Sequence, residues 1–507
     1  MSLALAHSRA RAGLHAPEVR VEVYLAGGLP ALNMVGLPEA AVRESRDRVR
    51  AAIQCAQFEF PQRRITVNLA PADLPKDGGR FDLPIALGIL AAQGDVEVQA
   101  LGGIETLGEL ALTGELRAVD GVLPAALAAA REARPLIVPA GNAAEAALAG
   151  GEAYAARTLL EVVAHLNGTK RLPRCEAVTS TRDMHSPDLA DVRGQLQARR
   201  ALEVAAAGGH HLLLIGPPGC GKTLLASRLP GLLPAASEAE ALESAAIASI
   251  SRRGLRLEQW RQRPFRAPHH SASAVALIGG GSGPRPGEVS LAHSGVLFLD
   301  ELGEWQRSAL EALREPLESG QVTIARAARS CEFPARFQLI AAMNPCPCGF
   351  AGDPSGRCRC SPDSVQRYRS RLSGPLLDRI DLQVAVPRLA AHELRSDGPR
   401  GEDSATVRAR VEAARERQLQ RAGCLNSQLG QRELDRDAAL QAADRALLER
   451  AMDALQLSAR GVHRILRVAR TLADLDGEPR IDSAHLSEAI GYRQLDRGIS
   501  ARMPAPA

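Results

Sequence analysis

A glycine-rich stretch near the middle of the chain sets its architecture: Gly216-Pro217-Pro218-Gly219-Cys220-Gly221-Lys222-Thr223. The apolar run 211–215 precedes it and the helix-prone run 224–229 follows it, which is the order strand, loop, helix of a P-loop. Glycines let such a loop turn its backbone N–H groups toward phosphate oxygens, and the following helix adds its positive end. Lys222 is expected to reach the β- and γ-phosphates, and Thr223 to bind Mg²⁺. The stretch predicts a nucleoside triphosphate site.

Two later apolar segments end in polar residues suited to nucleotide chemistry. Residues 294–299 lead into Asp300 and Glu301, where Asp300 is expected to hold Mg²⁺ and Glu301 to polarise the attacking water. Residues 337–343 lead into Asn344, at the end of a strand where ligand-binding residues gather in open parallel sheets. A simple strand-terminating Asn-Pro turn is the alternative for Asn344.

Length and composition limit the number of domains and the class of protein that the chain can form. At 507 residues it is too long for one core, and 45% apolar and 24% charged residues are ordinary for a soluble globular protein. Aromatic residues make up 3%, too few for extensive base stacking, and the net charge of +4 confines any basic surface to a local patch. We find no secretory signal or membrane-length apolar run, so we expect a cytoplasmic protein without a membrane partner.

Four of the nine cysteines form two C-x-C pairs, Cys346/Cys348 and Cys358/Cys360. Four thiolates match the number that a structural zinc requires, although C-x₂-C is the more usual spacing. The intervening segment is rich in Gly, Pro and Asp and cannot build a core of its own, which favours a metal staple. Four free thiols are the alternative. We predict a zinc-binding insert over 346–360.

The chain divides into four parts by pattern. Residues 1–167 read as a mixed α/β domain, 168–187 as a polar linker, 188–390 as the nucleotide core and 391–507 as a helical domain. In the first part we expect strands at 19–25, 64–69, 110–116 and 135–138, and helices over 39–57 and up to Ala130. In the last part we expect helices over 405–421, 438–455 and 458–475.

The segment 261–293 within the core is punctuated by Gly and Pro, so we expect an irregular loop. It contains the adjacent residues His269 and His270, which would point apart on regular structure. We therefore do not assign them as metal ligands.

Two stretches of the first domain resemble the C-terminal domain of Lon-type proteases: Lys76-Asp77-Gly78-Gly79-Arg80-Phe81-Asp82 and the run 112–124. Arg80 stands where that family has its nucleophilic serine, and Leu123 about where it has its lysine. Because the hydroxyl needs the amine to deprotonate it, we predict no peptidase activity. We expect Lys76 and Arg80 on an exposed loop of a domain that acts as a scaffold or contacts DNA, with a merely solvated loop as the alternative.

Several motifs together resemble the ComM (YifB-like) family of magnesium-chelatase-like AAA+ ATPases across essentially the full chain. They are the P-loop, Arg-Ala-Pro-His-His at 266–270, Cys-Pro-Cys-Gly at 346–349 and Ala469-Arg470-Thr471-Leu472-Ala473-Asp474-Leu475. The resemblance implies an α/β fold class: a Lon-like α+β domain, a three-layer α/β AAA+ core and a C-terminal helical lid. It implies ATP and Mg²⁺ as cofactors, and a hexameric ring motor that drives branch migration of DNA in recombination and natural transformation. The implied partners are single-stranded and branched DNA, further copies of the chain and recombination proteins.

The resemblance also implies roles for single residues. Asn344 matches the sensor that positions water, and Arg379 matches the arginine finger that reaches the neighbouring subunit's γ-phosphate from a surface. Arg460 matches the second sensor, with Arg464 as the alternative. Arg326 and Arg329 would lie near the tip of a hairpin that faces the ring's pore and contacts DNA. Solvated charges are the alternative for these arginines. The implied catalytic set is Lys222, Asp300, Glu301, Asn344, Arg379 and Arg460.

Two other functions compete with a DNA motor. A chelatase motor would insert Mg²⁺ into a tetrapyrrole with partner subunits, but the Lon-like front domain, which such motor subunits lack, argues against it. A protein-remodelling ATPase is the second alternative, and stimulation by casein rather than DNA would favour it.

Overall fold

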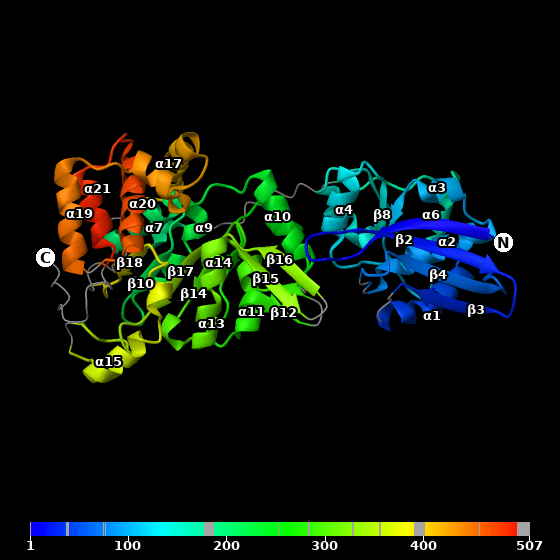
Figure 1. Cartoon of the computed structure of the whole chain (residues 1–507), viewed down its shortest axis with the longest axis horizontal. Coiled ribbons are helices and arrows are strands. Elements are labelled where there is room, and N and C mark those ends of the chain that lie inside the picture. The colour runs from blue at the N-terminus through cyan, green and yellow to red at the C-terminus, as the bar shows by residue number, and fades with distance from the viewer. Residues whose placement is uncertain are drawn as a thin grey trace.

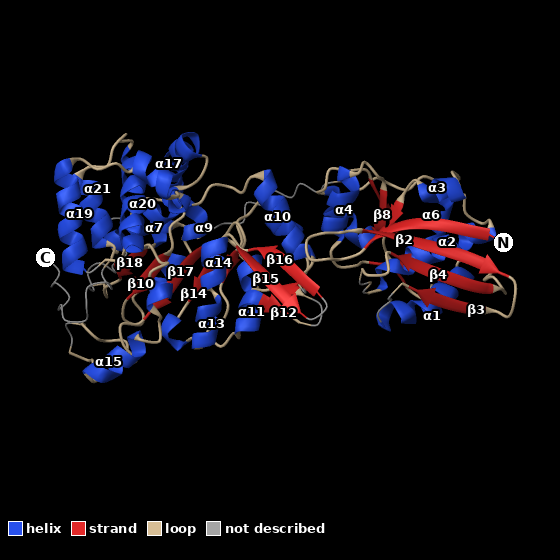
Figure 2. Cartoon of the chain, viewed as in Figure 1, coloured by secondary structure: helices blue, strands red, loops and turns tan. Residues whose placement is uncertain are grey.

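The computed structural model describes residues 2–36, 40–74, 76, 78–176, 187–251, 253–281, 284–326, 329–353, 356–389, 401–455 and 457–493. Figure 1 shows an elongated molecule in which an N-terminal domain, a central sheet domain and a helical domain follow one another along the long axis. The strands gather in two separate groups, one in each of the first two domains (Figure 2). Among the described helices, none is long and apolar enough to cross a membrane.

A seven-stranded mixed sheet, in the order β3-β4-β2-β1-β5-β8-β9, forms the N-terminal domain. Its strands are β1 (Ser2–Arg9), β2 (Glu18–Ala26), β3 (Ala31–Val35), β4 (Arg64–Ala70), β5 (Glu105–Thr106), β8 (Leu136–Pro139) and β9 (Ala153–Ala156). The alternation predicted for 64–69 is confirmed, since Ile65, Val67 and Leu69 are buried. The central strand β1, which pairs with both β2 and β5, was not predicted.

The helices of this domain are α1 (Ala40–Cys55), α2 (Asp82–Gln93), α3 (Val98–Gly102), α4 (Val122–Arg131), α5 (Ala143–Ala147) and α6 (Leu159–Leu166). Helix α2 is apolar on all sides because it is buried against the sheet. Its Gly88 lies so close to the sheet that a Cβ would sit 2.6 Å from Val23 Cγ2. The single strand expected over 110–116 is wrong: residues 111–115 form a turn between the short strands β6 (Glu109–Leu110) and β7 (Leu116–Arg117).

A five-stranded parallel sheet, in the order β11-β14-β17-β10-β18, forms the central domain. Its strands are β10 (Leu212–Ile215), β11 (Phe265–Arg266), β14 (Val296–Leu299), β17 (Gln338–Met343) and β18 (Leu382–Ala385). Helices α7 (Leu196–Gly208) and α9 (Leu229–Leu232) supply the buried layer on one face, and α13 (Arg307–Ala312) and α16 (Gly374–Leu377) supply that on the other. The strands are apolar throughout because both faces are covered. The expected three-layer α/β arrangement is present.

The segment 261–293 is more regular than we expected. It contains β11, α11 (Ala274–Ile278), the paired strands β12 (Gly279–Gly280) and β13 (Arg285–Pro286), and α12 (Glu288–Leu291). A two-pronged ion pair between Arg266 and Glu288, at 2.6 and 2.8 Å, ties the start of the segment to its last helix. A long-range contact thus orders a stretch whose local composition predicts a loop.

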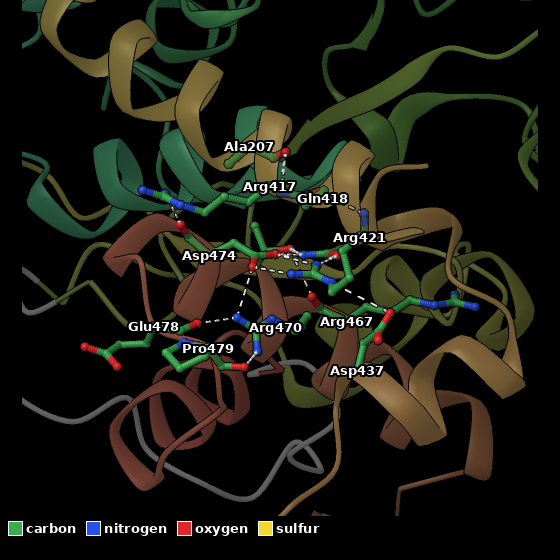
Figure 3. Close-up of polar contacts among 12 residues, drawn as sticks. Ala207, Arg417, Gln418, Arg421, Asp437, Arg467, Arg470, Asp474, Glu478 and Pro479 are labelled. Atoms are coloured by element: carbon green, nitrogen blue, oxygen red, sulfur yellow. Dashed lines mark hydrogen bonds and ion pairs between the residues drawn. The ribbon is translucent and has the colours of Figure 1, made fainter. Parts of the chain in front are cut away.

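The helical domain consists of α17 (Ser404–Ala422), α18 (Gln431–Asp437), α19 (Ala442–Leu455), α20 (Ala459–Asp476) and α21 (Ser483–Gly491). Its apolar residues share one core with α7 and the sheet. At its centre the buried Asp474 accepts from Arg421, Arg470 and Asn426, at 2.6 to 3.0 Å (Figure 3). This polar cluster holds α17 against α20.

The N-terminal and central domains meet at α4 and α10 (Glu238–Ser249), which Figure 1 shows next to each other. Gly121 N donates to Ser249 O at 3.0 Å, and Leu123 is fully buried against Ala245 and Ala246. Part of the predicted linker packs onto the N-terminal sheet, since Cys175 N donates to Ala153 O at 2.8 Å.

Candidate nucleotide site

The P-loop connects β10 to α8 (Lys222–Ala226) at the carboxyl edge of the parallel sheet. Gly219 and Gly221 have φ angles of 77° and 93°, a conformation that side chains other than glycine rarely adopt. Lys222 is largely buried, and its ammonium donates to Gly216 O at 2.7 Å and Pro217 O at 2.9 Å. The loop therefore curls around the lysine amine.

The acidic pair lies beside the P-loop because β14 and β10 flank β17 in the same sheet. Thr223 Oγ1 donates to Asp300 Oδ2 at 2.6 Å, so the two oxygens expected to bind Mg²⁺ already touch. Asn344 follows β17, and its Oδ1 accepts from Lys222 Nζ at 3.2 Å. The structure thus brings Lys222, Thr223, Asp300 and Asn344 together at one edge.

Glu301 is not part of this cluster, although it follows Asp300 directly in the chain. Its φ of 51° is in the left-handed region, and its carboxylate contacts His270 Nδ1 at 3.0 Å. The expectation that His269 and His270 point apart is wrong: their ring centroids lie 4.1 Å from each other. Sequence reasoning missed His270, because only the pairing of β11 with β14 brings residues 270 and 301 together.

We expect Arg379 on a surface, but the structure buries it. It is 8% exposed, because one of its terminal nitrogens donates to Pro375 O at 2.8 Å and the other pairs with Glu318. Arg464 is also engaged, since it donates to Asp381 Oδ1 at 2.5 Å and to Arg379 O at 3.0 Å. Arg460, at the start of α20, is exposed.

The four cysteines of 346–360 gather in space. Their Sγ atoms all lie within 4.8 Å of one another, and Sγ of Cys346 is 3.4 Å from that of Cys348 and 3.8 Å from that of Cys358. Zn–S bonds of about 2.3 Å place tetrahedral sulfurs about 3.8 Å apart, so the residues fit a structural zinc. Backbone N–H groups of Phe350 and Arg359 lower the pKa of Cys348 to about 6, whereas side-chain contacts with Cys348 and Cys346 raise the pKa of Cys360 to about 11. A metal would therefore have to displace a proton from Cys360 in order to bind it.

The predicted hairpin is present as β15 (Gln321–Arg326) and β16 (Arg329–Pro334), two antiparallel strands. Arg326 and Arg329 face each other at the last pair of its ladder. Their side chains lie outside the described residues, so the backbone alone places them next to the turn.

Neither Lys76 nor Arg80 lies on an exposed loop, which corrects our expectation. Lys76 is fully buried, with its ammonium on Gly36 O at 2.9 Å and also on Pro71 O. Arg80 is 4% exposed and donates to Arg9 O at 3.3 Å and to Asp120 O. Both cations bind backbone carbonyls inside the domain, so neither is available to DNA.

A parallel sheet with a P-loop at its carboxyl edge and helices after it defines the class as a P-loop protein. Family comparison narrows this class to magnesium-chelatase-like proteins. Residues 188–394 match magnesium chelatase, subunit ChlI; residues 21–142 match subunit ChlI of Mg-chelatase; and residues 401–493 match the C-terminal part of subunit ChlI.

Individual relatives are similar over nearly the whole chain. Competence protein ComM of Haemophilus influenzae is 53% identical over 504 residues, and uncharacterized protein YifB of Escherichia coli is 51% identical over 499, each covering 98% of both chains. The chain belongs to this ComM/YifB-like family of magnesium-chelatase-like proteins. It is also similar to Lon protease 2 of Bacillus subtilis, 28% identical over 192 residues and covering 34% of each chain.

Proposed function

We propose that the protein is an ATP-driven DNA motor: a ring of six copies that hydrolyses ATP and promotes branch migration in homologous recombination and natural transformation. The observation that carries the proposal is the meeting of Lys222, Thr223, Asp300 and Asn344 at one sheet edge. A relative that is similar over nearly the whole chain is named competence protein ComM, and this name supports a role in competence.

In the proposed reaction each residue of the site has one task. Lys222 stabilises negative charge on the β- and γ-phosphates, and Glu301 orients the attacking water. Thr223 and Asp300 hold Mg²⁺, which would neutralise charge on the phosphate oxygens when bound. Asn344 positions the water, and Arg379 of a neighbouring copy reaches the γ-phosphate. We retain Arg460 as the second sensor, because Arg464 is held by Asp381.

Contact with DNA is proposed for the hairpin β15–β16. Arg326 and Arg329 stand next to its turn, and guanidinium groups pair well with phosphate oxygens. The front domain is proposed as a Lon-like scaffold without peptidase activity, because Arg80 and Leu123 occupy the positions of the missing serine and lysine and both are buried.

The first experiment compares the ATPase rate without DNA, with single-stranded DNA and with a four-way junction, using Lys222→Ala as the blank. We expect stimulation that is strongest with the junction, absent from Lys222→Ala and reduced when Arg326 and Arg329 are both changed to Ala. Unchanged turnover with every DNA would contradict the proposal.

The magnesium-chelatase matches over residues 188–394 and 21–142 keep a chelatase motor as a second candidate. The match over 21–142 also weakens the argument that the front domain sets this chain apart from chelatase subunits. Metal insertion assays with a porphyrin and a casein-stimulation assay are therefore run alongside. Stimulation by casein without DNA would favour a protein-remodelling ATPase instead. Casein cleavage would contradict the absence of peptidase activity.

We further propose that Cys346, Cys348, Cys358 and Cys360 bind a structural Zn²⁺ that staples the 346–360 insert. Mass spectrometry of protein purified without chelators should find about one zinc per chain. The Cys358→Ser variant should lose the zinc. The Cys55→Ser variant, which changes an exposed cysteine in the N-terminal domain, should retain the zinc. Metal-free wild-type protein would contradict the assignment.

A further inference from the structure

Arg379 is held at a position from which it cannot reach another molecule. Its side chain is 9% exposed, because one terminal nitrogen pairs with the Glu318 carboxylate and the other binds Pro375 O. An arginine that contacts a neighbouring copy's phosphate must project from the surface of its own chain. Arg379 therefore has to leave Glu318 before it can act.

Glu318 is suited to a reversible hold. It lies in the last turn of α14 (Arg314–Ser319), and its side chain is 62% exposed, so water competes for it. The Arg379 guanidinium, and at longer range that of Arg460, hold the pKa of Glu318 below its usual range, so the carboxylate stays charged. A partly exposed pair of this kind is weak, and a triphosphate offers Arg379 a stronger anion.

While the Arg379 side chain is paired with Glu318, one of its hydrogen-bond donors lacks a partner within the described part of the chain. Arg379 Nε–H is buried and has no hydrogen-bond partner among the residues that the structure describes, and an unsatisfied buried donor costs free energy. The Arg379 carbonyl is also anchored, because Arg464 donates to Arg379 O at 3.0 Å. A change of side-chain rotamer is the simplest way for the guanidinium to leave Glu318.

We propose that Glu318 is a positioning residue for the arginine finger: it retains Arg379 against α14 until the triphosphate bound to a neighbouring copy draws the guanidinium away. The inference rests on the proposed function, in which Arg379 acts on a neighbour's nucleotide. Glu318 thereby keeps the finger withdrawn in a copy whose neighbour carries no triphosphate.

The test compares Glu318→Gln with Glu315→Gln, which changes an exposed acid one turn earlier on the same helix. We expect Glu318→Gln to raise kcat of the assembled protein by up to about fivefold, the equilibrium shift expected when a partly exposed ion pair is lost. KM for ATP should stay unchanged, Glu318→Asp should behave as wild type, and Glu315→Gln should have no effect. Adding Arg379→Ala to Glu318→Gln should abolish the gain.

Two results would overturn the inference: a kcat for Glu318→Gln equal to that of Glu315→Gln, or a loss as deep as that of Arg379→Ala. Failure of the underlying function looks different. Mixing Lys222→Ala subunits, which retain Arg379, with Arg379→Ala subunits should restore turnover if the finger acts between copies. No restoration, or full activity of Arg379→Ala alone, would remove the finger assignment itself.

Discussion

Asp300 and Glu301 are adjacent in the chain, yet the backbone gives their carboxylates different surroundings. Asp300 accepts from Thr223 and from Glu301 N, at 2.6 and 2.8 Å, which suits a metal-holding group. Glu301 is half-exposed, takes a left-handed φ of 51° and contacts His270. Strained backbone of this kind persists where the surrounding structure demands it, often at functional sites.

We predict that Glu301→Gln retains ATP binding but lowers kcat on the order of 10²-fold to 10⁴-fold, the range for loss of general-base assistance. Binding of a fluorescent ATP analogue and steady-state turnover measure the two effects. Glu304→Gln, which changes an exposed acid three residues later, is the matched control. Equal turnover in both variants would remove Glu301 from the reaction.

The ionisation of the buried Asp381 makes the stability of the central domain depend on pH. Burial alone would raise its pKa, but the Arg464 and His210 side chains hold the pKa of Asp381 well below its ordinary value of 3.8. A carboxylate with a lowered pKa in the folded state stabilises above its unfolded-state pKa. That stabilisation is lost as the pH falls below this value toward the folded-state pKa.

Asp381→Asn should therefore lower the free energy of unfolding by about 3 kcal/mol at pH 7, the cost of breaking a buried ion pair. The difference from wild type should be constant above about pH 5 and should narrow only in more acidic solution. Guanidinium titrations at several pH values measure it. A difference that does not narrow in acidic solution would contradict this role.

At the scale of elements, helix α20 holds the helical domain together and packs it against the core. Its Asp474 binds Arg470 from the same helix and Arg421 from α17 (Figure 3). Arg470 is 1% exposed, so removing its counter-charge leaves a buried cation unpaired.

We predict that Asp474→Asn costs about 3 kcal/mol of stability, because it leaves the buried Arg470 without a full counter-charge. Asp453→Asn, an exposed acid on α19, should cost less than about 0.5 kcal/mol. Urea unfolding followed by circular dichroism compares them. Equal midpoints would show that the cluster contributes no net stability.

The longer helices and strands of the core are the ones that local sequence patterns predict. Helix α20 and strands β10, β14 and β17 match the predicted segments closely, because each carries an uninterrupted apolar run or a helical period. The short strands β5, β11 and β12 were missed, since two residues are too few to show a period. Long-range pairing, and not local preference, makes them strands.

For the whole molecule, the junction between α4 and α10 sets how the front domain sits on the core. Leu123 is buried between the two domains, against Ala245 and Ala246. The resemblance to Lon-type proteases would place a lysine about here, and we propose that this leucine serves docking instead.

We predict that Leu123→Asp undocks the front domain, because a charge cannot be buried against Ala245 and Ala246 without large cost. Hydrogen exchange should show loss of protection at Gly121 N, which donates to Ser249 O in the intact protein. Leu112→Asp, at a leucine that is 58% exposed, should leave this amide protected. Retained protection in Leu123→Asp would contradict the docking role.

The amino-acid sequence was enough to predict the P-loop with its flanking strand and helix, the acidic pair after β14, Asn344 after β17 and the grouping of four cysteines. Each of these depends on residues close together in the chain, whose order alone sets their geometry. The pairs Glu301–His270 and Arg379–Glu318, and the burial of Lys76 and Arg80, emerged only from the folded chain. They join segments that lie far apart in sequence, and their proximity depends on how whole strands and helices pack.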